Sequence, residues 1–256
     1  MLFDYKNTPI YYNSIGKGPT TVLLHGFLES SQMWEPLMPT LSEEKNIVVI
    51  DLPGLGESGV ISPTHSMELM ATVVNDILDH LKISSATFVG HSMGGYVTMA
   101  FTEKYPEKVA KIVLLNSTPI ADNPERKKTR DRALKIIDRS PHAYISMAIA
   151  NWAGESSRDQ FSEAIENSKT LAYSFPVEGI KAALRGMKER KDRAFILKNF
   201  PRPKYILLGE DDPIIPLEDT LIIAQECGAN TKVIAGGHLS TLENQPAVLE
   251  FLQQTL

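Results

Sequence analysis

The stretch Thr87–Tyr96 reads TFVGHSMGGY, so that an apolar run ends abruptly and a single serine stands between glycines. This pattern predicts a sharp turn from a buried strand into a helix. In such a turn Ser92 takes up a strained backbone conformation, and its hydroxyl rises above the edge of the sheet. We expect Gly90 and Gly94 to be needed because strand and helix come too close for side chains there. The N–H of Met93, at the start of the helix, points to the same space.

Further apolar runs rich in β-branched residues occur along the chain, separated by stretches with helical spacing. The clearest helical pattern extends from Met70 to Leu81, with Ser66 as its N-cap. The opening segment alternates apolar and polar residues around Asn7-Thr8, which predicts an edge hairpin. Near-continuous apolar strands that alternate with helices are typical of an α/β fold with a mostly parallel sheet covered on both faces. The expected strands are residues 21–24, 46–50, 86–89, 111–115, 204–209 and 231–237.

The strand patterns stop between about Pro119 and Pro203, and helical patterns fill this interval. Asn123 and Ser140 are each followed by proline, which is typical of a helix N-cap and its first residue. We therefore expect one α/β core that carries an all-helical cap as an insertion. The predicted domains are a core at residues 1–118 and 203–256 and a cap (lid) at residues 119–202.

Composition and charge exclude several classes of function. The chain has 256 residues and a formal net charge of −5, which gives no reason to expect a nucleic-acid partner. Its single cysteine, Cys227, excludes an internal disulfide. No apolar run approaches the length of a membrane span, and no basic leader precedes an apolar stretch at the start. We expect a cytoplasmic protein with no membrane partner, no cofactor and no metal.

Polar and glycine-rich loops follow five of the predicted strands. Ligands of open parallel sheets bind outside the carboxyl ends of the strands, so these loops should meet at one rim. They bring a serine, an acidic pair and His238 to that rim, and periodicity does not separate Asp211 from Asp212. A metal site that combines His238 and an aspartate with His25 and His91 is an alternative, but the spacing of these residues does not fit metal ligands.

Several motifs resemble those of the α/β-hydrolase superfamily, in particular its small esterase-like members with a helical cap. Ser92, Asp212 and His238 follow one another in the order typical of this family. The resemblance also selects Asp212, because the family pattern Gly-x-x-Asp-x-x-x-Pro fits Gly209 and Pro216. The matching motifs are LHGF at 24–27, DLPGLGESG at 51–59, GHSMGG at 90–95, GEDDPIIP at 209–216 and GGH at 236–238.

The chemistry of ester hydrolysis gives each of these residues a role. Ser92 would be the nucleophile of a catalytic triad, and it needs His238 as its base because a neutral hydroxyl is a poor nucleophile. Asp212 would hold the imidazole in the right tautomer and stabilise its cation. The backbone N–H groups of Phe27 and Met93 are the expected oxyanion hole. His25 and His91 are expected to be structural and to hold the oxyanion loop and the nucleophile elbow, and Asp51 is expected to brace a loop.

The cap should supply apolar walls for the substrate pocket, together with residues from the core. Methionines and aromatic residues at helical spacing pack in cores more often than they line pockets, so only the apolar character of the site follows directly. The candidate substrate-binding residues are Phe27, Trp34 and Met93 from the core, and Tyr144, Met147, Trp152, Tyr173 and Phe175 from the cap.

The leading hypothesis is a serine hydrolase of the carboxylesterase type that acts on a small-molecule ester through an acyl-enzyme. A carbon–carbon bond (diketone) hydrolase and an acyl-carrier-protein methyl esterase of the same fold are alternatives. A ligand-binding receptor or signalling module with a hydrolase pocket is an alternative of another class. Although the chain is acidic overall, its cap is basic around residues 124–139 and 183–193. This is either a solvated face with ion pairs or a surface that steers acidic substrates, including an acidic acyl-carrier protein, to the pocket.

Overall fold

A computed structural model describes residues 1–155 and 158–256, and a single sheet forms the centre of the molecule. Its strands lie in the order β1-β2-β4-β3-β5-β6-β7-β8. All strand pairs from β4 to β8 across the sheet are parallel. The predicted α/β fold with a mostly parallel sheet is therefore confirmed. The strands are β1 Leu2–Tyr5, β2 Thr8–Ile15, β3 Thr20–Leu24, β4 Asn46–Ile50, β5 Ala86–His91, β6 Val109–Leu115, β7 Lys204–Gly209 and β8 Asn230–Ile234.

The antiparallel part of the sheet is the predicted hairpin at its edge. Strand β1 pairs with β2, and β2 pairs in turn with β4, both antiparallel. The two residues of the hairpin turn, Lys6 and Asn7, have φ values of 52° and 66°. Positive φ at both central residues gives a two-residue turn the twist that matches the flanking strands.

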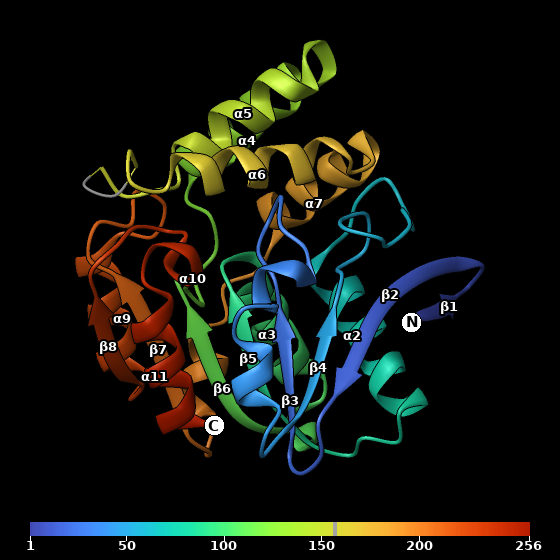
Figure 1. Cartoon of the computed structure of the whole chain (residues 1–256), viewed down its shortest axis with the longest axis vertical. Coiled ribbons are helices and arrows are strands. Elements are labelled where there is room, and N and C mark those ends of the chain that lie inside the picture. Colours follow the sequence, from blue (N-terminus) through green and yellow to red (C-terminus); the bar gives the residue numbers. More distant parts are fainter. Residues whose placement is uncertain (156–157) are drawn as a thin grey trace.

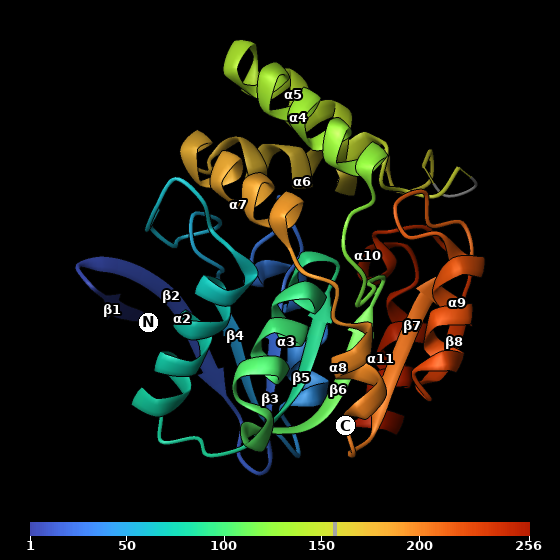
Figure 2. The same cartoon turned by 180° about the vertical axis from the view of Figure 1, so that it is seen from behind.

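Helices cover both faces of the sheet, and Figure 2 shows α2, α3 and α8 on one of them. Ser66 caps α2 as predicted, since its Oγ accepts a hydrogen bond from the Leu69 N–H at 3.1 Å. In the described part of the chain, no helix combines the length and the apolar character that crossing a membrane requires. The helices are η1 Ser31–Trp34, α1 Met38–Leu41, α2 Met67–His80, α3 Met93–Lys104, η2 Pro106–Lys108, α4 Pro124–Arg139, α5 Pro141–Ala150, α6 Ser162–Tyr173, α7 Val177–Glu189, α8 Ala194–Asn199, α9 Leu217–Glu226, α10 Ser240–Glu243 and α11 Gln245–Thr255.

Two apolar clusters lie on opposite faces of the sheet, which explains why its strands are almost continuously apolar. On one face, Val22 and Leu24 belong to the cluster that contains the buried residues of α2 and α3. On the other face, Leu23 belongs to the cluster that contains η1, α1 and α11 residues such as Trp34 and Leu252. Successive residues of β3 therefore pack in opposite directions, and both directions are apolar.

The insertion, which we define as residues 116–203 between β6 and β7, lies over the carboxyl ends of the parallel strands (Figure 1). Its described residues form α4 to α8 and no strand. Asn123 caps α4 by accepting a hydrogen bond from the Arg126 N–H at 2.9 Å. Ser140 is the N-cap residue of α5 and Pro141 its first residue, as predicted, although the Ser140 side chain makes no capping hydrogen bond. The domain boundaries at residues 119 and 202 stay a prediction.

The turn between β5 and α3 has the strained geometry that its sequence predicts. Ser92 has φ 48° and ψ −112°, a conformation that residues with a Cβ rarely adopt. A Cβ on Gly90 would lie 2.5 Å from the backbone of Gly94. The two glycines do not relieve the same contact, because a Cβ on Gly94 would instead lie 2.2 Å from the carbonyl oxygen of Leu24 in β3. The turn therefore packs against a neighbouring strand as well as against its own helix.

We expect Gly94→Ala to lower the free energy of unfolding by about 3 kcal/mol, because the new methyl group meets rigid backbone. The matched control is Gly228→Ala, where the nearest atom lies 4.0 Å from the added Cβ and only the φ of +65° is unfavourable. That variant should lose about 1 kcal/mol. Urea unfolding followed by circular dichroism measures both, and equal losses would contradict the packing argument.

Candidate active site

The side chains of Ser92, His238 and Asp212 form a hydrogen-bonded chain at the carboxyl ends of three parallel strands. The Nε2 atom of His238 lies 2.8 Å from the Ser92 Oγ, and its Nδ1 atom lies 2.8 Å from the Asp212 Oδ2. Since a carboxylate only accepts, Nδ1 carries the proton and Nε2 is left to accept from the serine hydroxyl. His238 is 3% exposed, so the chain is shielded from bulk water.

Four donors hold the Asp212 carboxylate. Its Oδ1 accepts hydrogen bonds from the N–H groups of Ile214 and Ile215 at 2.7 and 2.9 Å. Its Oδ2 accepts from the Asn116 amide at 2.8 Å as well as from His238. Burial alone would raise the pKa of Asp212, but the charge and hydrogen bond of His238 and the Asn116 amide outweigh it, and the pKa is lowered. Asp212, rather than Asp211, is thus the carboxylate in contact with the ring.

Asn116 is a site residue that the sequence analysis missed. It follows β6 directly, with a left-handed φ of 45°. Besides its bond to Asp212, its Nδ2 donates to the carbonyl oxygen of Gly237 at 3.1 Å. One amide thus connects the aspartate to the backbone beside His238. A polar residue that ends an apolar strand at this rim is the signal that could have identified it.

The loop that carries His238 is also held by groups outside the triad. The N–H of His238 donates to the carbonyl oxygen of Trp152, in the insertion, at 3.0 Å. The Glu243 carboxylate accepts from the N–H groups of Gly237 and Leu239 at 2.9 and 3.0 Å. Glu243 also accepts from the Gly154 N–H at 2.9 Å, and therefore joins the insertion to this loop. No sequence pattern pointed to Glu243.

The loop after β3 lies against the serine. A Cβ on Gly26 would lie 3.2 Å from the Ser92 Cβ, so this loop packs directly against the serine. Within residues 1–155 and 158–256, neither the Phe27 N–H nor the Met93 N–H makes a hydrogen bond. Neither N–H group is therefore occupied by another described residue, and their role as an oxyanion hole stays a prediction.

His25 and Asp51 have structural partners. His25 donates from Nδ1 to the carbonyl oxygen of Gly26 at 2.7 Å, and its Nε2 accepts from the Leu52 N–H at 2.8 Å. Burial lowers the pKa of His25, which agrees with this neutral tautomer. The two oxygens of Asp51 accept from the N–H groups of Ser31 and Glu57 at 2.6 and 2.8 Å. Both side chains therefore connect the loops after β3 and β4.

His91 forms a buried ion pair with Glu29, a partner that the sequence analysis missed. Its Nδ1 lies 2.7 Å from the Glu29 Oε2, and its Nε2 lies 2.9 Å from the carbonyl oxygen of His238. Both ring nitrogens face acceptors, so both carry protons and the ring is cationic. Burial opposes this charge, but the Glu29 carboxylate dominates and raises the pKa of His91. Glu29 also accepts from the Gly26 N–H at 2.7 Å, so the pair holds the loops on both sides of Ser92.

The metal site considered as an alternative does not form. The ring nitrogens of His25, His91 and His238 are all engaged by the hydrogen bonds described above. Throughout the part of the chain that the structure describes, no three His, Cys, Asp or Glu side chains are grouped so that they could hold a metal ion.

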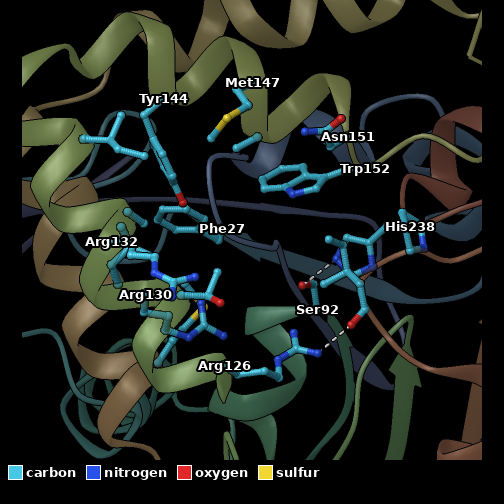
Figure 3. Close-up of a pocket in the computed structure, with 18 of the residues that line it drawn as sticks. Phe27, Ser92, Arg126, Arg130, Arg132, Tyr144, Met147, Asn151, Trp152 and His238 are labelled. Carbon is cyan, nitrogen blue, oxygen red and sulfur yellow. Dashed lines mark hydrogen bonds between the residues drawn. The ribbon is translucent and has the colours of Figure 1, made fainter. Parts of the chain in front are cut away.

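A cavity of about 490 Å³ opens between Ser92 and the insertion (Figure 3). Four of the predicted wall residues line it, namely Phe27, Tyr144, Met147 and Trp152. Trp152 packs edge-on to the His238 ring, with 6.1 Å between the ring centroids. The space above the serine is therefore bounded mainly by aromatic and aliphatic groups from both parts of the chain.

The other predicted wall residues lie elsewhere. Trp34 is fully buried on the opposite face of the sheet, in the cluster with Leu23, and its assignment to the pocket is wrong. Phe175 is 3% exposed and packs into the large apolar cluster rather than lining the cavity. Met93 is fully buried below the serine, and Tyr173 stacks on His142 with 4.5 Å between ring centroids. Trp34, Phe175 and Met93 thus pack in the interior of the protein, as aromatic residues and methionines often do, whereas Tyr173 is only partly buried.

Comparison with known proteins agrees with this fold. A family model described as alpha/beta hydrolase fold matches residues 19–245. A thermophilic esterase from Thermogutta terrifontis, solved with malate bound, is 31% identical with a TM-score of 0.91, over 96% of this chain and 92% of the esterase. The uncharacterized hydrolase YugF of Bacillus subtilis is 27% identical over 221 residues, which are 81% of this chain and 78% of that protein. A 2-hydroxy-6-oxononadienedioate/2-hydroxy-6-oxononatrienedioate hydrolase of Escherichia coli is 34% identical over 116 residues, 43% of this chain and 40% of that hydrolase.

The Glu29–His91 pair should stabilise the fold in a defined range of pH. Glu29 has a lowered pKa, so its contribution is present above its ordinary value of 4.5 and is lost as pH falls through the lowered one. His91 has a raised pKa, so its contribution is complete below 6.5 and is lost as pH rises through the raised value. We expect Glu29→Gln to lower the free energy of unfolding by about 3 kcal/mol near pH 6 and by less at higher pH.

Urea unfolding of wild type and Glu29→Gln between pH 5 and pH 10 measures this dependence. Glu44→Gln, which removes an exposed carboxylate, is the control and should show little change at any pH. A loss in Glu29→Gln that stays constant over the whole range would show that the His91 ring is not charged.

Proposed function

Because the chain belongs to the alpha/beta hydrolase family, we propose that it is a serine hydrolase that cleaves carboxylic esters through an acyl-enzyme intermediate. The observation that carries this proposal is the unbroken chain from Ser92 through His238 to Asp212, with 2.8 Å at each bond. These hydrogen-bonded residues lie beside a cavity whose lining is largely aromatic and aliphatic, which suits the organic part of an ester. The likeness to the Thermogutta esterase over most of both chains supports the choice of an ester over other substrates.

In the proposed mechanism, the Ser92 Oγ attacks the ester carbonyl carbon while its proton passes to the His238 Nε2. The resulting imidazolium is stabilised by Asp212, which remains ionised. The carbonyl oxygen becomes an oxyanion that accepts from the N–H groups of Phe27 and Met93. When the tetrahedral intermediate collapses, the bond to the alcohol oxygen breaks and His238 gives its proton to that oxygen. The alcohol leaves, and the acyl group stays on Ser92.

The second half of the reaction repeats these steps with water. His238 takes a proton from a water molecule, whose oxygen attacks the acyl carbon and forms a second tetrahedral intermediate. His238 then returns the proton to the Ser92 Oγ as the bond to the acyl group breaks. The free acid leaves, and the chain of hydrogen bonds is restored. The Asn116 amide and the backbone donors to Asp212 keep the carboxylate in place through both halves.

Carbon–carbon bond hydrolysis is a second candidate. The likeness to the nonadienedioate hydrolase of Escherichia coli, at 34% identity over 116 residues, is the observation that favours it. An activated diketone substrate distinguishes the two, because only a carbon–carbon bond hydrolase would turn it over faster than an ester. A receptor function has less support, because the nucleophile, base and acid are all present and in contact.

Removal of the nucleophile should abolish ester turnover. We expect wild type to hydrolyse p-nitrophenyl butyrate and Ser92→Ala to lose several orders of magnitude in kcat, because the acyl-enzyme cannot form. Release of p-nitrophenolate measures the rate, and the circular dichroism of both proteins controls for folding. Equal rates in the two proteins would refute the nucleophile assignment.

A neighbouring pair of acids allows a matched test of the third triad residue. We expect Asp212→Asn to lower kcat by about 10⁴, because the amide favours the wrong imidazole tautomer. Asp211→Asn makes the same change one residue away, where the carboxylate does not contact the ring, and should retain at least a tenth of the wild-type rate. A larger loss in Asp211→Asn than in Asp212→Asn would reverse the assignment.

A further inference from the structure

One wall of the cavity carries positive charge. Helix α4 contributes the side chains of Arg126, Arg130 and Arg132 to it, and no Asp or Glu is among the described residues that line the cavity. In Figure 3, Arg130 and Arg132 lie across the cavity from Ser92 and His238. Guanidinium groups stay charged at any physiological pH. A wall with this composition is unusual for a pocket that receives only neutral apolar molecules.

The nearby carboxylate does not neutralise this charge. Asp122 is fully buried at its side chain and pairs with Arg126 at 3.3 Å, with Arg130, and with Arg190 at 2.6 Å. Arg190 is itself buried and lies over the Tyr96 ring, 4.0 Å from its centroid. Three guanidinium groups thus share one carboxylate, which leaves a surplus of two positive charges beside the cavity.

Arg132 adds a further charge and has no counter-ion. Nowhere in the described part of the chain does another side chain form an ion pair or hydrogen bond with it. Its guanidinium lies at the cavity wall and is exposed, so it is open to a ligand in the cavity. Planar guanidinium groups bind carboxylates through two parallel hydrogen bonds, which suits them to recognise this group.

The hydroxyl of Tyr144 provides a neutral donor at the same wall. Burial raises the pKa of Tyr144 to about 12, so the hydroxyl stays protonated. It makes no hydrogen bond with any residue in 1–155 or 158–256, although its side chain lines the cavity. The hydroxyl oxygen is not among the enclosed atoms of the protein, so a ligand in the cavity would be able to accept a hydrogen bond from it.

We propose that the preferred substrates are esters with a carboxylate at the far end of the acyl group, that is, half-esters of dicarboxylic acids. The carboxylate would bind Arg132 and the Tyr144 hydroxyl, within the positive field of Arg126 and Arg130, and the ester carbonyl would lie at Ser92. The apolar residues between these ends, among them Phe27 and Trp152, would contact the methylene chain. This inference rests on the proposed ester hydrolysis and adds the class of substrate.

The test compares two aryl esters of equal acyl length, p-nitrophenyl hydrogen adipate and p-nitrophenyl hexanoate. The quantity measured is the ratio of their kcat/KM values, charged over neutral, after subtraction of spontaneous hydrolysis. We expect this ratio to exceed one in wild type and to fall about tenfold in Arg132→Gln, because the charge-assisted contact is lost. Sodium chloride at 300 mM should lower the wild-type ratio relative to 20 mM, because part of the attraction is screened.

Arg139→Gln is the matched control. It removes the same charge from the same helix at an exposed position outside the cavity, and it should leave the ratio within twofold of wild type. An equal decrease of the ratio in Arg132→Gln and Arg139→Gln would show that the general positive charge of the insertion, and not a local contact with Arg132, attracts the charged ester. A wild-type ratio of one or less would overturn the proposal.

A binding experiment separates this proposal from the proposed catalysis. Isothermal titration of the Ser92→Ala protein with monomethyl adipate and with methyl hexanoate requires no turnover. Tighter binding of the anion, lost in a Ser92→Ala/Arg132→Gln protein, supports the carboxylate site even if no ester is hydrolysed. Equal binding of the two compounds contradicts it, and hydrolysis of p-nitrophenyl hexanoate that depends on Ser92 would leave the proposed function intact.

Discussion

The site depends on one steric constraint, the lack of space around the turn between β5 and α3. Within this turn, an added Cβ would lie 2.5 Å from backbone at Gly90 and 2.2 Å from the Leu24 carbonyl oxygen at Gly94. At Gly95 it would lie 2.2 Å from the Ser117 Oγ. The backbone can therefore reverse direction within a few residues, and Ser92 keeps a φ of 48° because its neighbours leave it no alternative. The packing of the surrounding strands offsets the conformational strain at Ser92.

Around this turn, each group of the site is held by hydrogen bonds with a further polar side chain. Asn116 holds Asp212, Glu243 holds the loop of His238, and Glu29 with His91 holds the loops beside Ser92. Buried polar groups cost about 1–3 kcal/mol each when they are left without a partner, so such a network favours one arrangement strongly. The arginines of the insertion beside the cavity are not matched one to one in this way, because they outnumber the carboxylates near them.

Local patterns predicted most of the fold together with Ser92 and His238, whereas the choice of Asp212 over Asp211 came from the family resemblance. Apolar runs marked each strand of the parallel sheet, and the residue types just beyond them marked the rim where Ser92 and His238 meet. Asn116 and Glu29 escaped prediction because their partners Asp212 and His91 are distant in sequence, and Glu243 escaped it because a single polar residue in a short helix has no periodicity. Trp34 was misplaced for the opposite reason, since an aromatic residue near a motif does not reveal which face of the sheet it packs on.

The hydrogen bond from the His238 N–H to the Trp152 carbonyl makes the insertion part of the machinery that positions the base. Residues 152–154 also approach the histidine loop closely, since a Cβ on Gly237 would lie 2.2 Å from the Gly154 nitrogen. Residues 152–154 therefore help to position His238, in addition to forming part of the insertion above the cavity. A chimaera that carries the insertion of a relative must keep these contacts between the insertion and the histidine loop. Without them, we expect the chimaera to have a new pocket but a misplaced His238 imidazole.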